Sequence, residues 1–399
     1  MAKLFSYRDH RFSDEEPQRN PYTSSDGGNH DGYDPFGNTA YAGGADTIEL
    51  SWDAFTPEDQ KRSKKTFSRY FLGLTVYLAV AALIANLTFV FVQRSGAAKN
   101  AFFDSGLFLL LVNSVSLYLF GFVAFYLIIR RMRTVPKPKS SITFREFLLF
   151  FFVAEAALGV GAWIGNFLND WISTILSGIF RTDWVITDDV SALIENTELW
   201  ITLPFVALLG PIAEEFLFRK FMIDRLSIYG DKLAIIVSAV AFGFFHGNLY
   251  QFFYAALLGL ILGYLYTKTR NVWYPIALHM AINFFSSLTV LLLPFFEEFS
   301  AMYEALEEGE QINLTVLGGN LLVIILYVLL HYGAILAGAI LFFTMRKRIF
   351  ISDRCEVAIP KGRRTSTAWC NVGAILFLLY CTVNILTNIF SPLLLSLLS

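Results

Sequence analysis

The feature that most constrains this chain is its set of long apolar segments. Several reach about 20 residues, the length that an α-helix needs to cross the hydrocarbon core of a bilayer. Nine such segments are expected, at residues 70–92, 106–129, 147–168, 199–222, 233–247, 250–266, 272–293, 315–344 and 369–397. The chain is 55% hydrophobic and 16% charged, whereas soluble domains are roughly one quarter charged. The sequence therefore predicts an all-α bundle of membrane-spanning helices.

Charged residues between the segments predict the orientation, because Lys and Arg accumulate in cytoplasmic loops. Basic residues precede the first span at 61–69, follow the second at 130–139 and recur at 346–364. Acidic residues dominate the loop at 169–198 and the segment at 297–310. This alternation places the amino terminus in the cytoplasm. The fifth and sixth predicted spans are short, and a re-entrant pair would preserve the same loop charges.

The chain divides into four predicted regions. Residues 1–60 are rich in Asp, Gly, Asn and Ser and contain no apolar run, so we expect a disordered cytoplasmic tail. A cleavable signal peptide is not expected because polar sequence follows the charged start. Two membrane helices follow at 61–140, a central helical region at 141–348, and a basic loop with a final helix at 349–399. The tail composition and the lack of eukaryotic targeting signals favour a bacterial plasma membrane.

Two adjacent carboxylates in the fourth predicted span, Glu214 and Glu215, are the polar groups that most need an explanation. A charge at membrane depth costs a few kcal/mol or more, so it indicates a functional site with a partner. Successive helical residues point about 100° apart, so these carboxylates face different directions. Glu215 shares a face with Arg219, four residues later, and can pair with it. Glu214 is then left for chemistry, although a structural ion pair beside an interfacial charge is the alternative.

Two histidines and a carboxamide follow on later spans. Phe242 and His246 are one turn apart, so the aromatic ring should pack beside the imidazole. His279 and Asn283 have the same spacing and can both donate hydrogen bonds toward one point, as an oxyanion requires. Each group alone more often has a structural role, because His and Asn often join membrane helices.

The predicted boundaries also give the depth of these residues. At 1.5 Å per residue, Glu214 and His279 would lie about 10 Å from the cytoplasmic boundary, and His246 about 20 Å from it. The helix carrying His246 should therefore be tilted or begin earlier, or one of the boundaries is wrong. Glu155 and His331 are two further polar residues near the middle of their spans. They have either a role in the site or a mutual hydrogen bond between helices.

The motifs Glu-Glu-x-x-x-Arg, Phe-x-x-x-His and His-x-x-x-Asn occur in this order on separate predicted helices. This arrangement resembles the CPBP family, the CAAX-processing and bacteriocin-processing intramembrane proteases also called the Abi family. The resemblance covers residues 199–285, and it implies a protease core within 141–348. It also implies hydrolysis of a peptide bond by water that an acidic residue activates.

The resemblance implies a role for each matching residue. Glu214 would be the general base, and His246 would hold or activate the water. His279 and Asn283 would stabilise the tetrahedral oxyanion. The supporting residues that shape the site would be Glu215, Arg219 and Phe242.

The resemblance leaves the metal open, since the family has been described both as metalloproteases and as glutamic proteases. The chain has no His-Glu-x-x-His motif, and a mechanism without a cofactor is favoured. Zinc is the alternative, with Glu214, His246 and His279 as its ligands. The expected partners are the lipid bilayer and a peptide or membrane-protein substrate, prenylated or not. No basic stripe interleaved with aromatic residues indicates nucleic acid, and nothing indicates the oligomeric state.

Two other functions compete with proteolysis. A non-catalytic membrane protein of the binding or bacteriocin-immunity type could use the same site to hold a peptide. A proton-coupled transporter could use the carboxylates and histidines as a relay. Transporters often contain inverted repeats, and none is visible in this sequence.

Overall fold

The structure is a computed structural model that describes residues 55–97, 100–103, 105–135, 137–186, 199–307, 313–349, 351 and 355–393. All regular structure in these residues is helical. The predicted all-α membrane bundle is confirmed, and the chain is an integral membrane protein. The tail predicted at 1–60 lies outside the described residues up to residue 54, and the first helix already begins at Pro57.

Seven helices are long and apolar enough to cross a membrane. They are α1 (Pro57–Arg94), the α2–η4–α3 helix (Gly106–Ile129), α4 (Phe144–Phe180), the helix from α6 to η7 (Trp200–Tyr229), α10 (Leu249–Thr269), α13 (Leu314–Met345) and α15 (Val372–Ile389). Two expected spans, α9 (Asp231–Phe245) and α11 (Trp273–Ser287), have 15 residues each. That is about 22 Å of helix, less than the roughly 30 Å of the hydrocarbon core. By length, the described residues therefore provide seven spans rather than nine.

The second and fourth candidate spans contain wider π-helical turns. The second consists of α2 (Gly106–Val115), η4 (Ser116–Gly121) and α3 (Phe122–Ile129). The fourth consists of α6 (Leu199–Leu203), η5 (Pro204–Leu209), α7 (Gly210–Glu215), η6 (Phe216–Ile223), α8 (Asp224–Leu226) and η7 (Ser227–Tyr229). Of these, η4, η5 and η6 are π-helices. Two of the three flank the predicted glutamates.

Several predicted boundaries change. The third span extends to Phe180 instead of residue 168. The predicted seventh span divides into α11 and α12 (Leu293–Glu307), so the acidic segment is helical as far as Glu307. A separate helix, α14 (Lys361–Trp369), forms in the predicted basic loop. The final span then begins at Val372 as α15 and ends at Ile389, three positions before Pro392.

The helices begin where polar side chains cap them. Thr56 and Thr143 each form a capping box, with Asp59 and Glu146 respectively, so the free N–H groups at the starts of α1 and α4 are satisfied. Asn248 caps α10 directly after Gly247, which has a φ of 69°. This positive φ lets the chain reverse between α9 and α10 within a few residues.

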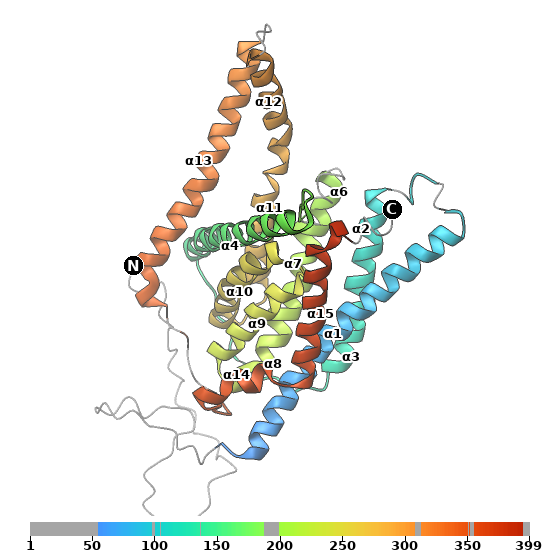
Figure 1. Ribbon diagram of the computed structural model, residues 1–399. Helices are drawn as coiled ribbons and strands as arrows, with labels where there is room; N and C mark the ends of the chain where they lie inside the picture. Colours follow the sequence, from blue (N-terminus) through green and yellow to red (C-terminus); the bar gives the residue numbers. More distant parts are fainter. Residues whose placement is uncertain are drawn as a thin grey trace, which may run out of the picture.

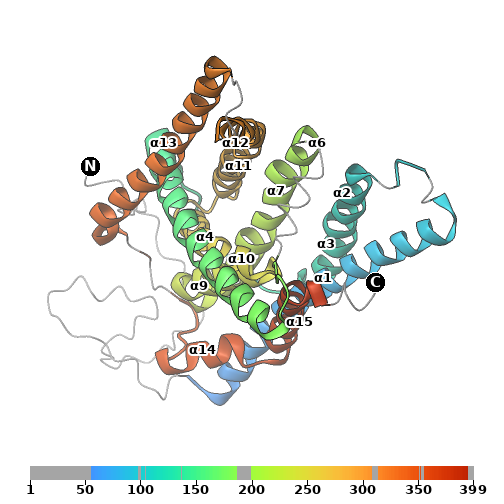
Figure 2. The same cartoon turned by 45° about the horizontal axis from the view of Figure 1, so that its top comes forward.

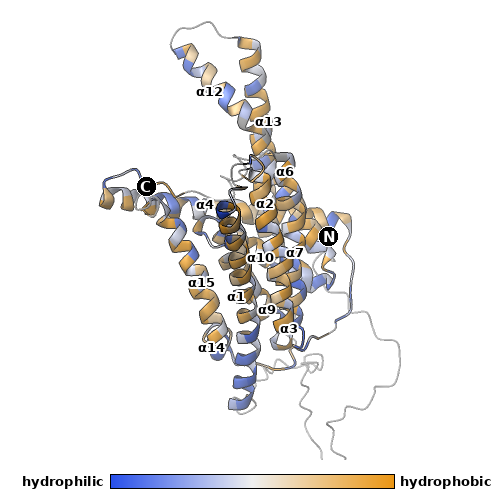
Figure 3. Cartoon of the chain, turned by 90° about the vertical axis from the view of Figure 1, so that its right-hand side faces the viewer, coloured by the Kyte–Doolittle hydropathy of each residue, from blue (hydrophilic) through white to orange (hydrophobic). Residues whose placement is uncertain are grey.

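The helices pack around α9 and α10, as Figures 1 and 2 show, with α4 across one side and α1 beside α15 on the other. Small residues allow the close contacts. An added Cβ at Gly161 of α4 would lie 2.3 Å from Cα of Tyr254 in α10. The α12–α13 hairpin extends away from the bundle, and α13 is largely apolar along its length (Figure 3). This packing places α7, α9 and α11 side by side.

Candidate active site

The predicted glutamates lie on α7, a short α-helical segment between η5 and η6. Wider π turns are rare and often occur at functional sites, because they change the direction of side chains. Buried hydroxyl groups stabilise the wide turn of η6. Ser238 Oγ donates to the carbonyl oxygen of Phe218 at 2.8 Å, and Tyr70 Oη donates to that of Leu217 at 2.5 Å. Neighbouring helices therefore hold the backbone that carries the glutamates.

Glu215 and Arg219 form the ion pair that their spacing predicts. Arg219 Nε approaches Glu215 Oε2 to 3.0 Å, and both side chains are completely buried. The N–H is not aligned for a hydrogen bond, so this contact is electrostatic. The guanidinium carbon lies 4.6 Å from the centre of the Phe242 ring, a favourable cation–π contact. Arg219 thus connects the glutamate helix to α9.

The second oxygen of Glu215 holds His279. Glu215 Oε1 lies 3.0 Å from His279 Nδ1, and His279 is buried. An ionised carboxylate only accepts hydrogen bonds, so Nδ1 carries the proton and donates it. Nε2 is directed to the other glutamate, at 3.8 Å from Glu214 Oε2. A neutral His279 ring would therefore present a lone pair at Nε2, and an imidazolium ring would present an N–H.

His246 lies at the carboxyl-terminal end of α9, where its Nδ1 is 2.8 Å from the carbonyl oxygen of Phe242. Because a carbonyl accepts, Nδ1 carries the proton in this contact, and in the neutral ring Nε2 is then the acceptor nitrogen. The Phe242 ring packs edge-on against both histidines, with centroid distances of 4.8 Å to His246 and 5.8 Å to His279. Phe242 therefore fixes the spacing between the two imidazoles.

Asn283 occupies the next turn of α11 after His279. Its Nδ2 donates to the carbonyl oxygen of Val206 in η5 at 2.9 Å. A carboxamide has two N–H groups, so this bond orients Asn283 and leaves a second donor. The structure brings Glu214, Glu215 and His279 into one cluster, adds His246 through Phe242, and ties Asn283 to the turn that precedes the glutamates.

The structure corrects the predicted depth of Glu214. The helix that carries it continues to Tyr229 rather than ending at residue 222. Glu214 therefore lies about 22 Å along the helix from Tyr229. His246 lies about 22 Å along α9 from Asp231, so the two residues reach the same level from adjacent helix ends. For Glu214 and His246 the predicted mismatch arose from the wrong boundary, whereas His279 still lies only six residues after Trp273, the first residue of α11.

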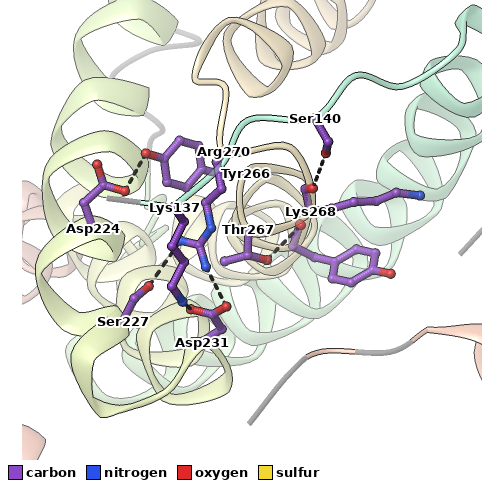
Figure 4. A network of polar contacts seen from close by, with 10 residues as sticks. Lys137, Ser140, Asp224, Ser227, Asp231, Tyr266, Thr267, Lys268 and Arg270 are labelled. Carbon is purple, nitrogen blue, oxygen red and sulfur yellow. Dashed lines mark hydrogen bonds and ion pairs between the residues drawn. The ribbon is translucent and has the colours of Figure 1, made fainter. Parts of the chain in front are cut away.

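A polar network joins the helix that carries the glutamates to α9 and α10, at the ends of these helices away from the site (Figure 4). Asp231, the first residue of α9, receives Arg270 Nη2 at 2.5 Å and Lys137 Nζ at 2.8 Å. Asp224 receives Tyr266 Oη at 2.6 Å. Burial alone would raise the pKa of Asp231, but the two cations outweigh it and hold this pKa below its usual value. The network fixes α8, the start of α9 and the end of α10 relative to one another.

The site contains a tyrosine that the sequence did not indicate. Tyr118 of η4 reaches toward α7, where an added Cβ at Gly210 would lie 3.4 Å from Tyr118 Oη. Tyrosines are common in membrane proteins, so Tyr118 did not stand out in the sequence. The glycine one turn before Glu214 was the local signal that another group approaches this helix.

Glu155 and His331 do not form the hydrogen bond considered between them. Glu155 is buried, and its Oε1 has no hydrogen-bond partner within the part of the chain that the structure describes. His331 Nδ1 is also unpartnered there, and its ring stacks on Phe285 and Tyr327. Aromatic contacts, rather than a hydrogen bond to Glu155, hold this histidine.

The donor set was also tested against zinc. His246 and His279 each have Nδ1 hydrogen-bonded to an acceptor, which is the usual arrangement when Nε2 binds a metal. Among the described residues, however, no three His, Cys, Asp or Glu side chains converge closely enough to hold an ion. The arrangement therefore does not fit a metal site, and the chemistry below uses none.

Residues 196–285 match the family described as Type II CAAX prenyl endopeptidase Rce1-like. This segment is Rce1-like. It contains all three motifs, so the resemblance predicted from the sequence is confirmed.

Two relatives also match this chain. It is 32% identical over 80 residues to "Putative membrane peptidase YdiL" of Bacillus subtilis, and the aligned region covers 20% of this chain and 33% of that protein. It is 29% identical over 131 residues to "Membrane-embedded CAAX protease MroQ" of Staphylococcus aureus, which covers 31% of this chain and 53% of that protein. The matches thus span a third to about half of these relatives. No solved structure matches the chain significantly.

Proposed function

We propose that this protein is an intramembrane endopeptidase that hydrolyses a peptide bond of a peptide or membrane-associated protein. The observation that carries the proposal is the different state of the two adjacent glutamates. Glu215 is fully buried and held by Arg219, whereas the Glu214 side chain is 21% exposed and faces His279 at 3.8 Å. One carboxylate is therefore structural, and the other remains accessible to water and substrate. The Rce1-like match over 196–285 supports the same conclusion.

In the proposed reaction Glu214 accepts a proton from a water molecule that His246 helps to hold. The water oxygen bonds to the carbonyl carbon of the peptide, and the carbonyl π electrons move onto its oxygen. When the tetrahedral intermediate collapses, the C–N bond breaks and Glu214 returns the proton to the leaving amine. The products are a carboxylic acid and an amine, which exchange the remaining proton to become a carboxylate and an ammonium group.

The oxyanion requires donors that are already oriented. Asn283 supplies its second N–H, since the bond to Val206 uses the first. His279 supplies an N–H at Nε2 in its imidazolium form, while Nδ1 donates to Glu215. Glu215 and Arg219 then act by fixing and stabilising this ring, and Phe242 acts by holding both histidines in place.

We place the enzyme in a bacterial plasma membrane with a cytoplasmic amino terminus. Support comes from the basic residues near the ends of several spans and from the bacterial relatives. The substrate is a membrane-associated polypeptide. Paired peptides with and without a prenyl group would decide whether prenylation is needed.

The test uses the full chain in liposomes, mixed with detergent-extracted bacterial membrane proteins, and identifies new peptide termini by mass spectrometry. We expect cleavage by the wild type, and none by Glu214→Gln or Glu214→Ala of equal folded yield. Glu297→Gln, in the acidic helix α12, is the matched control and should cleave normally. Full activity of the Glu214 variants would exclude the mechanism. If the wild type cleaves nothing and Glu214→Gln retains the biological effect of the wild type, a binding protein is favoured.

Metal dependence has its own measurement. We expect active protein to retain cleavage after chelation and to contain no stoichiometric zinc by elemental analysis. Zinc bound in a 1:1 ratio, together with activity that chelation abolishes and zinc restores, would contradict this expectation.

A further inference from the structure

The hydroxyl of Tyr118 is the feature of the site that the proposed reaction has not used. Tyr118 lies on η4, in the second membrane span, outside the Rce1-like segment at 196–285. A π-helical turn again carries the residue. Within the described residues, no group forms a hydrogen bond with its Oη. An uncommitted O–H therefore reaches the turn of α7 that precedes Glu214.

The position of this hydroxyl follows from the direction of helical side chains. Cα–Cβ bonds tilt toward the amino-terminal end of a helix, so a side chain covers the turn before its own Cα. The Glu214 side chain accordingly covers the turn that begins at Gly210. That residue has no side chain, and the place of its Cβ lies 3.4 Å from Tyr118 Oη. The carboxylate and the phenol therefore face a common space.

The donors proposed above come from a helix on the other side of α7. His279 and Asn283 belong to α11, while Tyr118 comes from η4, and Figures 1 and 2 show α7 between α11 and the α2–α3 helix. A peptide over Glu214 would be flanked from both sides. The donors on the α11 side are already partly used, because His279 binds Glu215 and Asn283 binds Val206.

We propose that Tyr118 is a further catalytic residue, whose phenol donates a hydrogen bond to the carbonyl oxygen of the scissile peptide as that oxygen becomes negative. The proposal rests on the proposed endopeptidase function and adds a donor to it. The proton stays on the phenol throughout, so the water, Glu214 and the leaving amine exchange protons as described above. Neutral His279 has a lone pair at Nε2, and in that state Tyr118 and Asn283 are the donors that remain.

The experiment compares Tyr118→Phe with the wild type in liposomes. The probe is a quenched-fluorescence peptide built on the first cleavage site found by mass spectrometry. Loss of an oxyanion donor typically lowers kcat about 10²–10³-fold, and we expect that loss with little change in KM. The matched control is Tyr126→Phe, which removes a hydroxyl from the same membrane span two turns later, where the ring packs against Phe221. This control should retain wild-type kcat.

The outcomes separate this proposal from the endopeptidase assignment. Wild-type cleavage that depends on Glu214 but is unchanged in Tyr118→Phe overturns the role of Tyr118 alone. An increase of KM with unchanged kcat also overturns it, because the contact would then be made in the ground state. Absence of any Glu214-dependent cleavage overturns both proposals.

A second variant preserves the shape of the site in case Tyr118→Phe fails to fold. Fluorotyrosine at position 118 keeps the ring and the O–H but makes the phenol more acidic. We expect the alkaline limb of the kcat profile to move to lower pH, because a phenolate cannot donate. An unchanged profile would contradict the donor role.

Discussion

Replacing Arg219 with Leu tests how the buried polar cluster is held together. Arg219 and Glu215 are both fully buried, with 3.0 Å between Nε and Oε2. Removing one partner of a buried ion pair leaves an uncompensated charge and costs about 3–5 kcal/mol. We therefore expect Arg219→Leu to lower the free energy of unfolding by that amount, which changes the folded-to-unfolded ratio by a factor of about 10²–10³ or more.

The double variant Glu215→Leu, Arg219→Leu should be more stable than the single variant. It removes the stranded carboxylate and leaves only His279 Nδ1 without its acceptor, at a cost of about 1–3 kcal/mol. It should nevertheless be inactive, because His279 is no longer oriented. Unfolding of purified protein in mixed micelles, followed by tryptophan fluorescence, measures the stabilities, and peptide cleavage measures the activity.

The chain supplies a matched control at the start of α1. Glu58 and Arg62 have the same spacing and approach to 2.5 Å, but their side chains are 69% and 74% exposed. Arg62→Leu should change stability by no more than about 0.5 kcal/mol. The reasoning is refuted if Arg219→Leu costs as little as this control, or if the double variant is at least as unstable as Arg219→Leu.

Three further predictions concern the scaffold. The pKa of Asp231 is lower in the folded protein than its unfolded value of about 3.9. Its stabilising contribution is therefore fully present above the unfolded pKa and is lost as pH falls through the folded pKa. Asp231→Asn should lower the thermal midpoint in detergent at pH 7, and the difference from the wild type should vanish in strong acid. Gly338→Ala should destabilise the fold, since its Cβ would lie 1.7 Å from the carbonyl oxygen of Phe152. The control is Gly333→Ala on the same helix, whose Cβ would meet nothing within 4 Å. It should be neutral or stabilise by up to about 1 kcal/mol in the same assay. Glu155→Gln should leave the unfolding midpoint unchanged or raise it, because the buried Oε1 has no partner among the described residues, and a loss above about 1 kcal/mol would show that the carboxylate is held.

The helical content and the pairing of residues within one helix were predictable from the sequence. Apolar length predicted the membrane helices, and four-residue spacing predicted that Glu215 meets Arg219 and that Phe242 packs on His246. These contacts depend on helical geometry, which is the same in every protein. The boundaries were less certain, as the helix ending at Tyr229 shows.

The sequence by itself determined that the chain is an integral membrane protein and which acidic, histidine and asparagine side chains stand out from its apolar helices. Only the tertiary structure decided how they combine: that Glu215 holds His279, that Asn283 binds Val206, and that Tyr118 reaches the turn before Glu214. The physical reason is that a helix specifies only its own faces. Which faces meet, and at what depth, depends on small-residue contacts, on π-helical turns and on the polar network around Asp231.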